Sequence, residues 1–233
     1  SGVTTVVTGV LKSAMKAEEH GLVVCGGKGI VSRQTPQEIN QVEESFGFST
    51  EDINRLKYAS RMSAKVDNTA IQAGYPLYHH AFFITENKKW AVIQQGMNEK
   101  DRTARRYHWL SDNVKDFVVE PHDAVIGEIK REVALDMTAK ESIECQKTST
   151  DIAKEEPKKV MRMLKSIRPA FQKSLQEWMP TVKKKEYIID VLSLPHNLNW
   201  KVMKRAYDFQ PKNYEQLLGI RGIGPATVRG LAL

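Results

Sequence analysis

Residues 77–95 read LYHHAFFITENKKWAVIQQ, and this stretch decides the fold of the first half of the chain. Its two ends, Leu77–Ile84 and Trp90–Gln95, alternate between the two faces of an extended strand, and the five residues Thr85–Lys89 separate them. Period-two alternation on both sides of a short polar loop predicts a β-hairpin. We therefore expect a small antiparallel sheet here.

Helical patterns precede this hairpin. Apolar residues from Thr4 to Glu19 follow the i, i+3, i+4 spacing of an amphipathic helix. The segment Thr35–Glu38 reads as a capping box with proline at the first helical position, which predicts a helix from Pro36 to about Phe46. The pair Ser49 and Asp52 predicts the start of another helix.

The remaining elements complete the predicted architecture. Leu22–Cys25 reads as a short buried strand, and the pattern from Ser111 to about Gln176 is helical again. The fold class is therefore predicted as α+β and helix-dominated. We expect domains at residues 1–156 (α+β, with the β-hairpin), 157–197 (a basic helical connector) and 198–233 (a helical C-terminal lobe).

Charge is distributed unevenly along the chain. The 233 residues carry 35 Lys and Arg against 28 Asp and Glu, a net charge of +7. Residues 1–157 hold 20 basic and 23 acidic side chains, whereas residues 158–233 hold 15 and 5 and so carry a net charge of +10. Such a basic lobe attracts polyanions, of which nucleic acid is the commonest in cells. Two widely separated cysteines, Cys25 and Cys145, disfavour a disulfide scaffold and a cysteine zinc site, so we expect a cytoplasmic protein.

The last twenty residues, 214–233, read YEQLLGIRGIGPATVRGLAL. They predict a short helix, a Gly-Ile-Gly turn and a second helix opened by proline, which resembles the helix-hairpin-helix motif of DNA repair proteins. Glycines let a turn present free N–H groups, and these groups can hold a phosphate oxygen together with a helix N-terminus. A plain αα-hairpin remains the alternative. The predicted nucleic-acid-binding residues are Arg221, Gly222, Ile223, Gly224, Thr227 and Arg229.

Polar residues also gather around the β-hairpin. Phosphodiester hydrolysis needs an activated water, a cation and donors to the phosphoryl oxygens. Candidate catalytic residues are Lys65, Asp67, His79, His80, Gln95, Arg105 and His108. Asp67 and His80 are the candidate ligands for Mg²⁺ or Mn²⁺. Because adjacent strand residues point to opposite faces, His79 and His80 can share one pocket only across a bulge.

A structural interpretation of the same residues stays open. In it the two histidines are hydrogen-bonded members of a sheet, and Asp67 and Asn68 cap the next helix. A second polar group, comprising Glu120, His122 and Glu128, matches no known metal motif.

The sequence resembles a known family through several unusual blocks. These are GVTTVVTGVLKSAM, GGKGIVSRQTPQEI, YASRMSAKVDNTAIQAGYPLYHHAFF, WAVIQQGMN, ARRYHWLS and the terminal motif. Together they resemble the family of archaeal and thermophilic bacterial proteins catalogued as domain of unknown function number seven hundred and sixty-three. The resemblance leads us to expect that family members carry a further segment ahead of the first block and a continuation after Leu233. The resemblance implies no particular reaction.

Three functions follow from these observations. The first is a DNA-processing protein that acts in DNA repair as a metal-dependent nuclease and binds the DNA backbone independently of sequence. The second is a non-catalytic DNA-binding module. The third is a base-excision glycosylase, which ranks lowest because the catalytic aspartate that follows the motif in such enzymes has no counterpart after Leu233. We expect DNA as the partner, no membrane partner and no organic cofactor.

Overall fold

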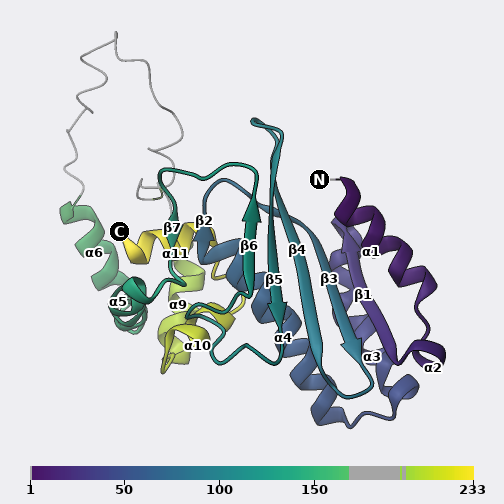
Figure 1. Ribbon diagram of the computed structural model, residues 1–233. Coiled ribbons are helices and arrows are strands. Elements are labelled where there is room, and N and C mark those ends of the chain that lie inside the picture. The colour runs from purple at the N-terminus through teal and green to yellow at the C-terminus, as the bar shows by residue number, and fades with distance from the viewer. Residues whose placement is uncertain (1, 168–194, 196–197) are drawn as a thin grey trace.

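The computed structural model describes residues 2–167, 195 and 198–233 (Figure 1). In this part of the chain the main sheet has five antiparallel strands in the order β1-β3-β4-β5-β6. They are β1 (Leu22–Lys28), β3 (Leu77–Thr85), β4 (Trp90–Asn98), β5 (Thr103–Leu110) and β6 (Ala124–Gly127). A smaller sheet pairs β2 (Ile71–Gln72) with β7 (Leu135–Asp136). The fold is α+β, as predicted.

The predicted hairpin is confirmed as β3 and β4. Ile84 lies opposite Trp90, and the N–H group of Thr85 donates to the carbonyl of Lys89 at 2.9 Å to close the loop. A register shift lies between Leu77 and His79. From His79 onward the pairing is regular, so His79 and His80 point to opposite faces of the sheet.

Two further strands flank this hairpin and enlarge the sheet beyond the prediction. The strand predicted at Leu22–Cys25 continues through Gly26 and Gly27 to Lys28 and pairs with β3. Gly26 has φ +87°, and a Cβ atom there would lie 2.3 Å from the carbonyl oxygen of His80. Only glycine fits this close approach of two strands. On the other side, β5 pairs with β4 along its whole length.

The helix predicted from Thr4 to Glu19 is interrupted. It forms α1 (Gly2–Ala14) and the short α2 (Ala17–His20), which ends at Gly21 in the left-handed conformation. The helix predicted from Pro36 is confirmed as α3 (Thr35–Phe46), after the 3-10 turn η1 (Gly29–Gln34).

The predicted capping box of α3 is wrong. Glu38 does not return to the helix start but accepts a hydrogen bond from the N–H group of Gly26 at 2.6 Å. The ammonium of Lys12 lies 2.7 Å from the same carboxylate. Glu38 therefore joins α1, β1 and α3. The capping box of α4 (Thr50–Thr69), by contrast, is confirmed, with Ser49 and Asp52 bonded reciprocally.

The segment from Ser111 to Ser142 corrects the prediction of helical structure with breaks at its prolines, because it contains no α-helix. It contains β6, β7, irregular loops and the 3-10 turn η2 (Lys140–Ser142). The apolar residues of this segment, such as Val118 and Met137, are spaced far apart and enter the core from loops. Helical structure resumes at α5 (Ile143–Ala153) and α6 (Pro157–Ile167). The rest of the predicted helix, to Gln176, lies outside the described residues.

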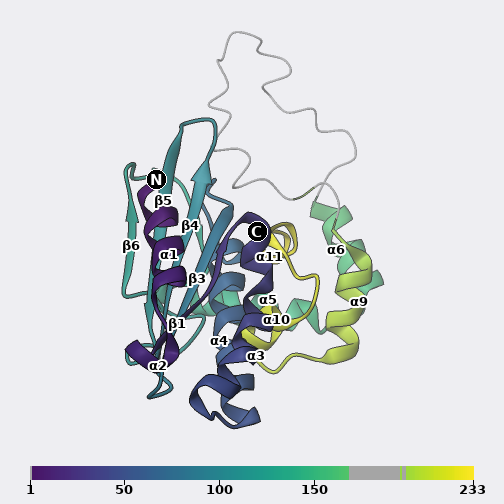
Figure 2. The same ribbon diagram turned by 90° about the vertical axis from the view of Figure 1, so that its right-hand side faces the viewer.

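Three helices form the C-terminal region, and the last two lie where the sequence predicts a pair of helices around the Gly-Ile-Gly turn. They are α9 (Trp200–Phe209), α10 (Tyr214–Gly219) and α11 (Pro225–Ala232). Figure 2 shows α3 and α4 on one side of the main sheet and these helices beyond them. None of the helices in the described ranges is long and apolar enough to cross a membrane.

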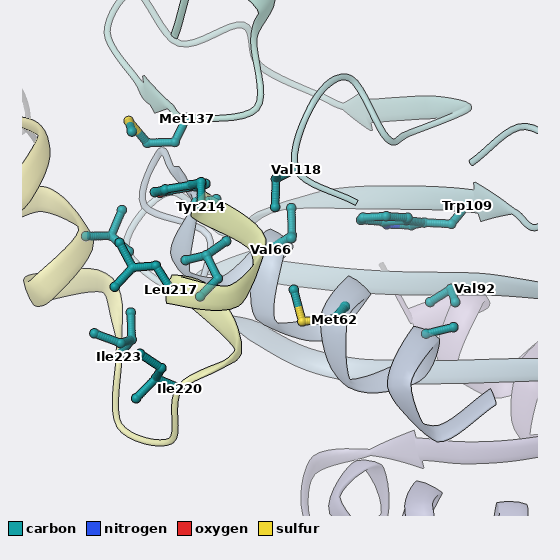
Figure 3. Packing of buried hydrophobic residues seen from close by; sticks show 14 of the residues in the cluster. Met62, Val66, Val92, Trp109, Val118, Met137, Tyr214, Leu217, Ile220 and Ile223 are labelled. Carbon is teal, nitrogen blue, oxygen red and sulfur yellow. The ribbon is translucent and has the colours of Figure 1, made fainter. Parts of the chain in front are cut away.

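A single hydrophobic cluster connects the sheet, α4 and the C-terminal helices. Trp109 of β5 and Val66 of α4 belong to it, and so do Leu217 and Ile223 of the C-terminal region. Figure 3 shows Val66 of α4 between Trp109 of the sheet and Leu217 of the C-terminal region. The C-terminal helices therefore pack directly on α4.

Candidate functional site

Helix α4 carries side chains toward two different neighbours. Ser60 and Asp67 are seven residues apart, so they share the helix face that packs on the sheet. Lys65 lies two positions before Asp67, about 200° away around the helix axis. It contacts the C-terminal helices. The predicted catalytic residues Lys65 and Asp67 are thus separated by the helix itself.

Asp67 is fully buried and accepts hydrogen bonds from three side chains. Gln94 Nε2 donates to Oδ2 at 2.5 Å, and Trp109 Nε1 donates to the same oxygen at 3.0 Å. His122 Nε2 lies 2.5 Å from Oδ1. Burial raises the pKa of the Asp67 carboxyl, and the His122 imidazole opposes that rise. Both carboxylate oxygens are therefore occupied by protein donors.

His80 continues this network on the adjacent strand. Its Nδ1 lies 3.0 Å from Gln94 Oε1, and its Nε2 lies 2.8 Å from Ser60 Oγ. Because an amide oxygen can only accept, Nδ1 carries the hydrogen and Nε2 accepts from the serine hydroxyl. Burial lowers the pKa of His80 to about 4, so the ring is neutral at pH 7.

The buried polar network, as we call it, therefore runs from Ser60 through His80 and Gln94 to Asp67 and His122. It joins α4 to two strands and to the loop after β5. This network brings together two of the predicted catalytic residues, Asp67 and His80, and Gln94 bridges them. In the part of the chain that the structure describes, no group of three or more His, Cys, Asp or Glu is arranged to hold a metal ion.

The other predicted catalytic residues lie elsewhere. His79 and Gln95 are on the opposite face of the sheet, where His79 Nε2 lies 3.1 Å from Thr8 Oγ1 of α1. Arg105 lies over the ring of Tyr75, 4.7 Å from its centroid. His108, on the face of Gln95, has its pKa lowered by burial and by Arg106. These residues do not converge on Asp67.

The network contains residues that sequence reasoning missed. Ser60 has no local signal, because a buried polar group can be recognised only through its partner. His122 was placed in a separate polar group, although it lies against Asp67 and packs edge-on to Trp109 at 4.6 Å between ring centroids. Alternation along β5 is the signal that points Tyr107 and Trp109 inward.

The C-terminal region holds the second cluster of predicted residues. Residues 220–224, which we call the glycine turn, connect α10 to α11. Gly222 has φ +99° and is exposed, whereas Ile223 is 1% exposed and anchors the turn in the core. The N–H groups of Gly222 and Gly224 have no acceptor among the described residues. The first N–H groups of α11 have no intrahelical acceptor either.

Side chains from α4, β2 and α9 hold the glycine turn in place. Lys65 donates to the carbonyl of Ile223, and Arg205 of α9 donates to the carbonyl of Arg221. Gln72 Nε2 donates to the Pro225 carbonyl at 2.9 Å. Two of these contacts are to carbonyl oxygens of the turn and the third is to that of Pro225, the first residue of α11, so they fix the turn without occupying its N–H groups.

Two of the predicted nucleic-acid-binding side chains point inward. Thr227 is 4% exposed, and Arg229 donates from Nη1 to Gln72 Oε1 at 3.1 Å. Arg221, Lys201 and Lys204, by contrast, are exposed. Residues 198–233 hold six basic and two acidic side chains, a net charge of +4. Burial and Arg61 lower the pKa of Lys65 beneath the turn.

These observations define an α+β protein that has an antiparallel sheet, a buried polar network and a basic helical region. Comparison with protein families identifies it further: the model "Protein of unknown function (DUF763)" matches residues 1–233. The chain therefore belongs to the DUF763 family. No curated protein and no solved structure matched it.

Proposed function

We propose that this protein binds DNA through the sugar-phosphate backbone, and that the glycine turn with α11 acts as a helix-hairpin-helix. The observation that carries the proposal is the pair of free N–H groups at Gly222 and Gly224, which lie on an exposed turn at the start of a helix. Such groups bind a phosphate oxygen by hydrogen bonds and by the helix dipole.

The charge around the turn supports the same proposal. Exposed Arg221 is part of the turn, and Lys201, Lys204 and Arg205 lie on α9, which packs against it. A Cβ atom at Gly222 would meet Val202 of α9 at 2.7 Å, so the two segments are in close contact. Contacts of this kind read the backbone rather than the bases.

Gly224 offers a direct test because it can be changed without straining the fold. Its φ is −135°, and an added Cβ atom would meet the Gly222 carbonyl oxygen at 3.8 Å, an ordinary van der Waals contact. We expect Gly224→Ala to keep the melting temperature but to obstruct the phosphate. Gly219→Ala is the matched control, because its added Cβ would meet nothing within 4 Å.

The measurement is fluorescence anisotropy with two duplexes of unrelated sequence. If about four phosphates are neutralised, the log–log salt slope is roughly −3 to −4. Loss of a hydrogen bond to a charged oxygen, about 1.5 kcal/mol, weakens binding by Gly224→Ala roughly tenfold. Absence of binding at low salt, a salt-independent affinity, or equal affinities for Gly224→Ala and wild type would refute the proposal.

DNA cleavage is tested in the same preparations. Metal-dependent cleavage by Asp67 and His80 stays a prediction, and so does base excision. End-labelled DNA incubated with Mg²⁺ or Mn²⁺ remains intact if the protein only binds. Cleavage that a chelator and Asp67→Ala both abolish identifies a nuclease, whereas alkali-labile sites without strand breaks identify a glycosylase. The anisotropy measurement tests DNA binding in the same way whichever of these cleavage results is obtained.

A further inference from the structure

A cavity of about 260 Å³ lies between the start of α1 and the face of the sheet opposite α4. Val3 and Thr4 line it from α1, whose beginning is near the point marked N in Figure 2. Gln95 and Arg106 line it from β4 and β5, and Glu128 follows β6. The volume is slightly below roughly 300 Å³, where small-molecule sites begin, so a ligand here is small.

The wall of this cavity contains a buried acceptor without a donor. Gln95 is 1% exposed, and its Oε1 has no hydrogen-bond partner in the described part of the chain. A buried polar atom left unpaired destabilises the fold, and native proteins contain few of them. The Gln95 carbonyl therefore fits a bound molecule that supplies an N–H or O–H donor.

A second unpaired acceptor lies beside it. The Thr8 hydroxyl donates to the Thr4 carbonyl at 2.9 Å, so His79 Nε2 carries the hydrogen that lies between it and Thr8 Oγ1. Burial and Lys28 lower the pKa of His79, so the ring is neutral and its Nδ1 is an acceptor. Nδ1 is buried and has no partner within the described residues. Because His79 lies directly opposite Gln95, two acceptors without donors are neighbours on one face.

The charges of the cavity are balanced. Neither Arg106 nor Glu128 forms an ion pair with another described residue. One guanidinium and one carboxylate in the same cavity favour a ligand that carries both charges over a phosphate or a simple amine. The first N–H groups of α1, at Val3 and Thr4, have no intrahelical acceptor. Their partial positive charge adds to that of Arg106 in attracting a carboxylate.

We propose that this cavity binds a free α-amino acid. Its ammonium group donates to Gln95 Oε1 and faces Glu128, and its carboxylate is bound by Arg106 near the start of α1. An ammonium group has three hydrogens, so it can donate both to the unpaired Gln95 Oε1 and to the Glu128 carboxylate that line the cavity. The cavity lies on the other face of the sheet from the buried polar network, and this proposal does not depend on DNA binding.

The test is isothermal titration calorimetry of the wild-type protein with each of the twenty free L-amino acids. We expect at least one to bind, and we expect its decarboxylated amine and its deaminated acid each to bind more than tenfold more weakly. Arg106→Gln should weaken the same interaction more than tenfold. Arg33→Gln, at an exposed position on η1, is the matched control and should bind as wild type does.

Gln95→Leu tests whether the Gln95 side chain binds a ligand or only supports the fold. It removes the unpaired acceptor, so we expect it to abolish binding without lowering the melting temperature in the absence of ligand. If this variant does not fold, Arg106→Gln decides alone. The proposal is overturned if none of the twenty amino acids binds at millimolar concentration, if Arg106→Gln binds as tightly as wild type, or if acetate or methylamine alone binds as tightly as the amino acid.

Discussion

Acid should destabilise this protein through His80. The imidazole is buried and neutral, and its pKa is lowered from 6.5 to about 4. Above pH 6.5 the ring is neutral in both the folded and the unfolded state, so it has no effect on the pH dependence. As the pH decreases from 6.5 to about 4, the unfolded state binds a proton that the folded state does not. The free energy of unfolding therefore decreases as the solution becomes more acidic. Below about pH 4 both states are protonated and the loss is complete.

The size of this effect follows from the two pKa values. A shift of about 2.5 units at about 1.36 kcal/mol per unit corresponds to roughly 3 kcal/mol of stability lost between pH 7 and pH 4. Urea unfolding at a series of pH values measures it. His79 and His108 also have lowered pKa values and add losses of the same sign. A comparison with His80→Gln removes those shared contributions.

His80→Gln cannot titrate, so its stability should depend less on pH. We expect the difference in unfolding free energy between wild type and His80→Gln to shrink by about 3 kcal/mol from pH 7 to pH 4. A histidine NMR titration offers a second measurement that needs no variant, and the His80 ring protons should shift near pH 4. Parallel stability curves, or titration of His80 near pH 6.5, would refute the assignment of a neutral, hydrogen-bonded ring.

Three substitutions test the packing around the two clusters, each by urea unfolding. Asp67→Ala leaves three buried donors unpaired, and at about 1 kcal/mol or more for each we expect a loss of at least about 3 kcal/mol; a loss below about 1 kcal/mol would contradict the network. Gly222→Ala places a side chain at φ +99°, so we expect the free energy of unfolding to decrease by about 1–2 kcal/mol. Gly219→Ala should leave the free energy of unfolding unchanged. Ile223→Ala opens a cavity in the core and should cost about 3 kcal/mol; an unchanged midpoint would show that the turn is not anchored.

Short-range signals in the sequence predicted much of the fold. The β3–β4 hairpin, the start of α4 and the C-terminal helices all depend on caps, turns and periodicity within about ten residues. Strand β5 was missed because its polar residues, such as Arg106 and His108, lie on the sheet face away from α4 and obscure the alternation of the two inward aromatic side chains. The helical structure predicted between Ser111 and Ser142 is wrong because widely spaced apolar residues in loops resemble one face of a helix, whereas from Ile143 onward the prediction is confirmed by α5 and α6.

The site was harder to predict because its contacts are distant in sequence. His122 and Asp67 are in contact although they are 55 positions apart in the sequence. Lys65 and Ile223 are in contact at a separation of 158 positions. The sequence shows that His79 and His80 face opposite sides of a strand, and this is confirmed. Nothing in the local sequence pattern shows whether His79 or His80 packs against α4. That choice depends on the register of three strands.

Helix α4 explains why Lys65 and Asp67 serve different parts of the molecule. A straight helix turns about 100° per residue, so two side chains two positions apart point in nearly opposite directions. Asp67 faces the sheet and is held by Gln94 and Trp109, and this fixes the rotation of the helix about its own axis. The same rotation places the Lys65 ammonium under the Ile223 carbonyl. The position of the glycine turn therefore depends on a carboxylate that it does not touch, because one rigid helix connects the two.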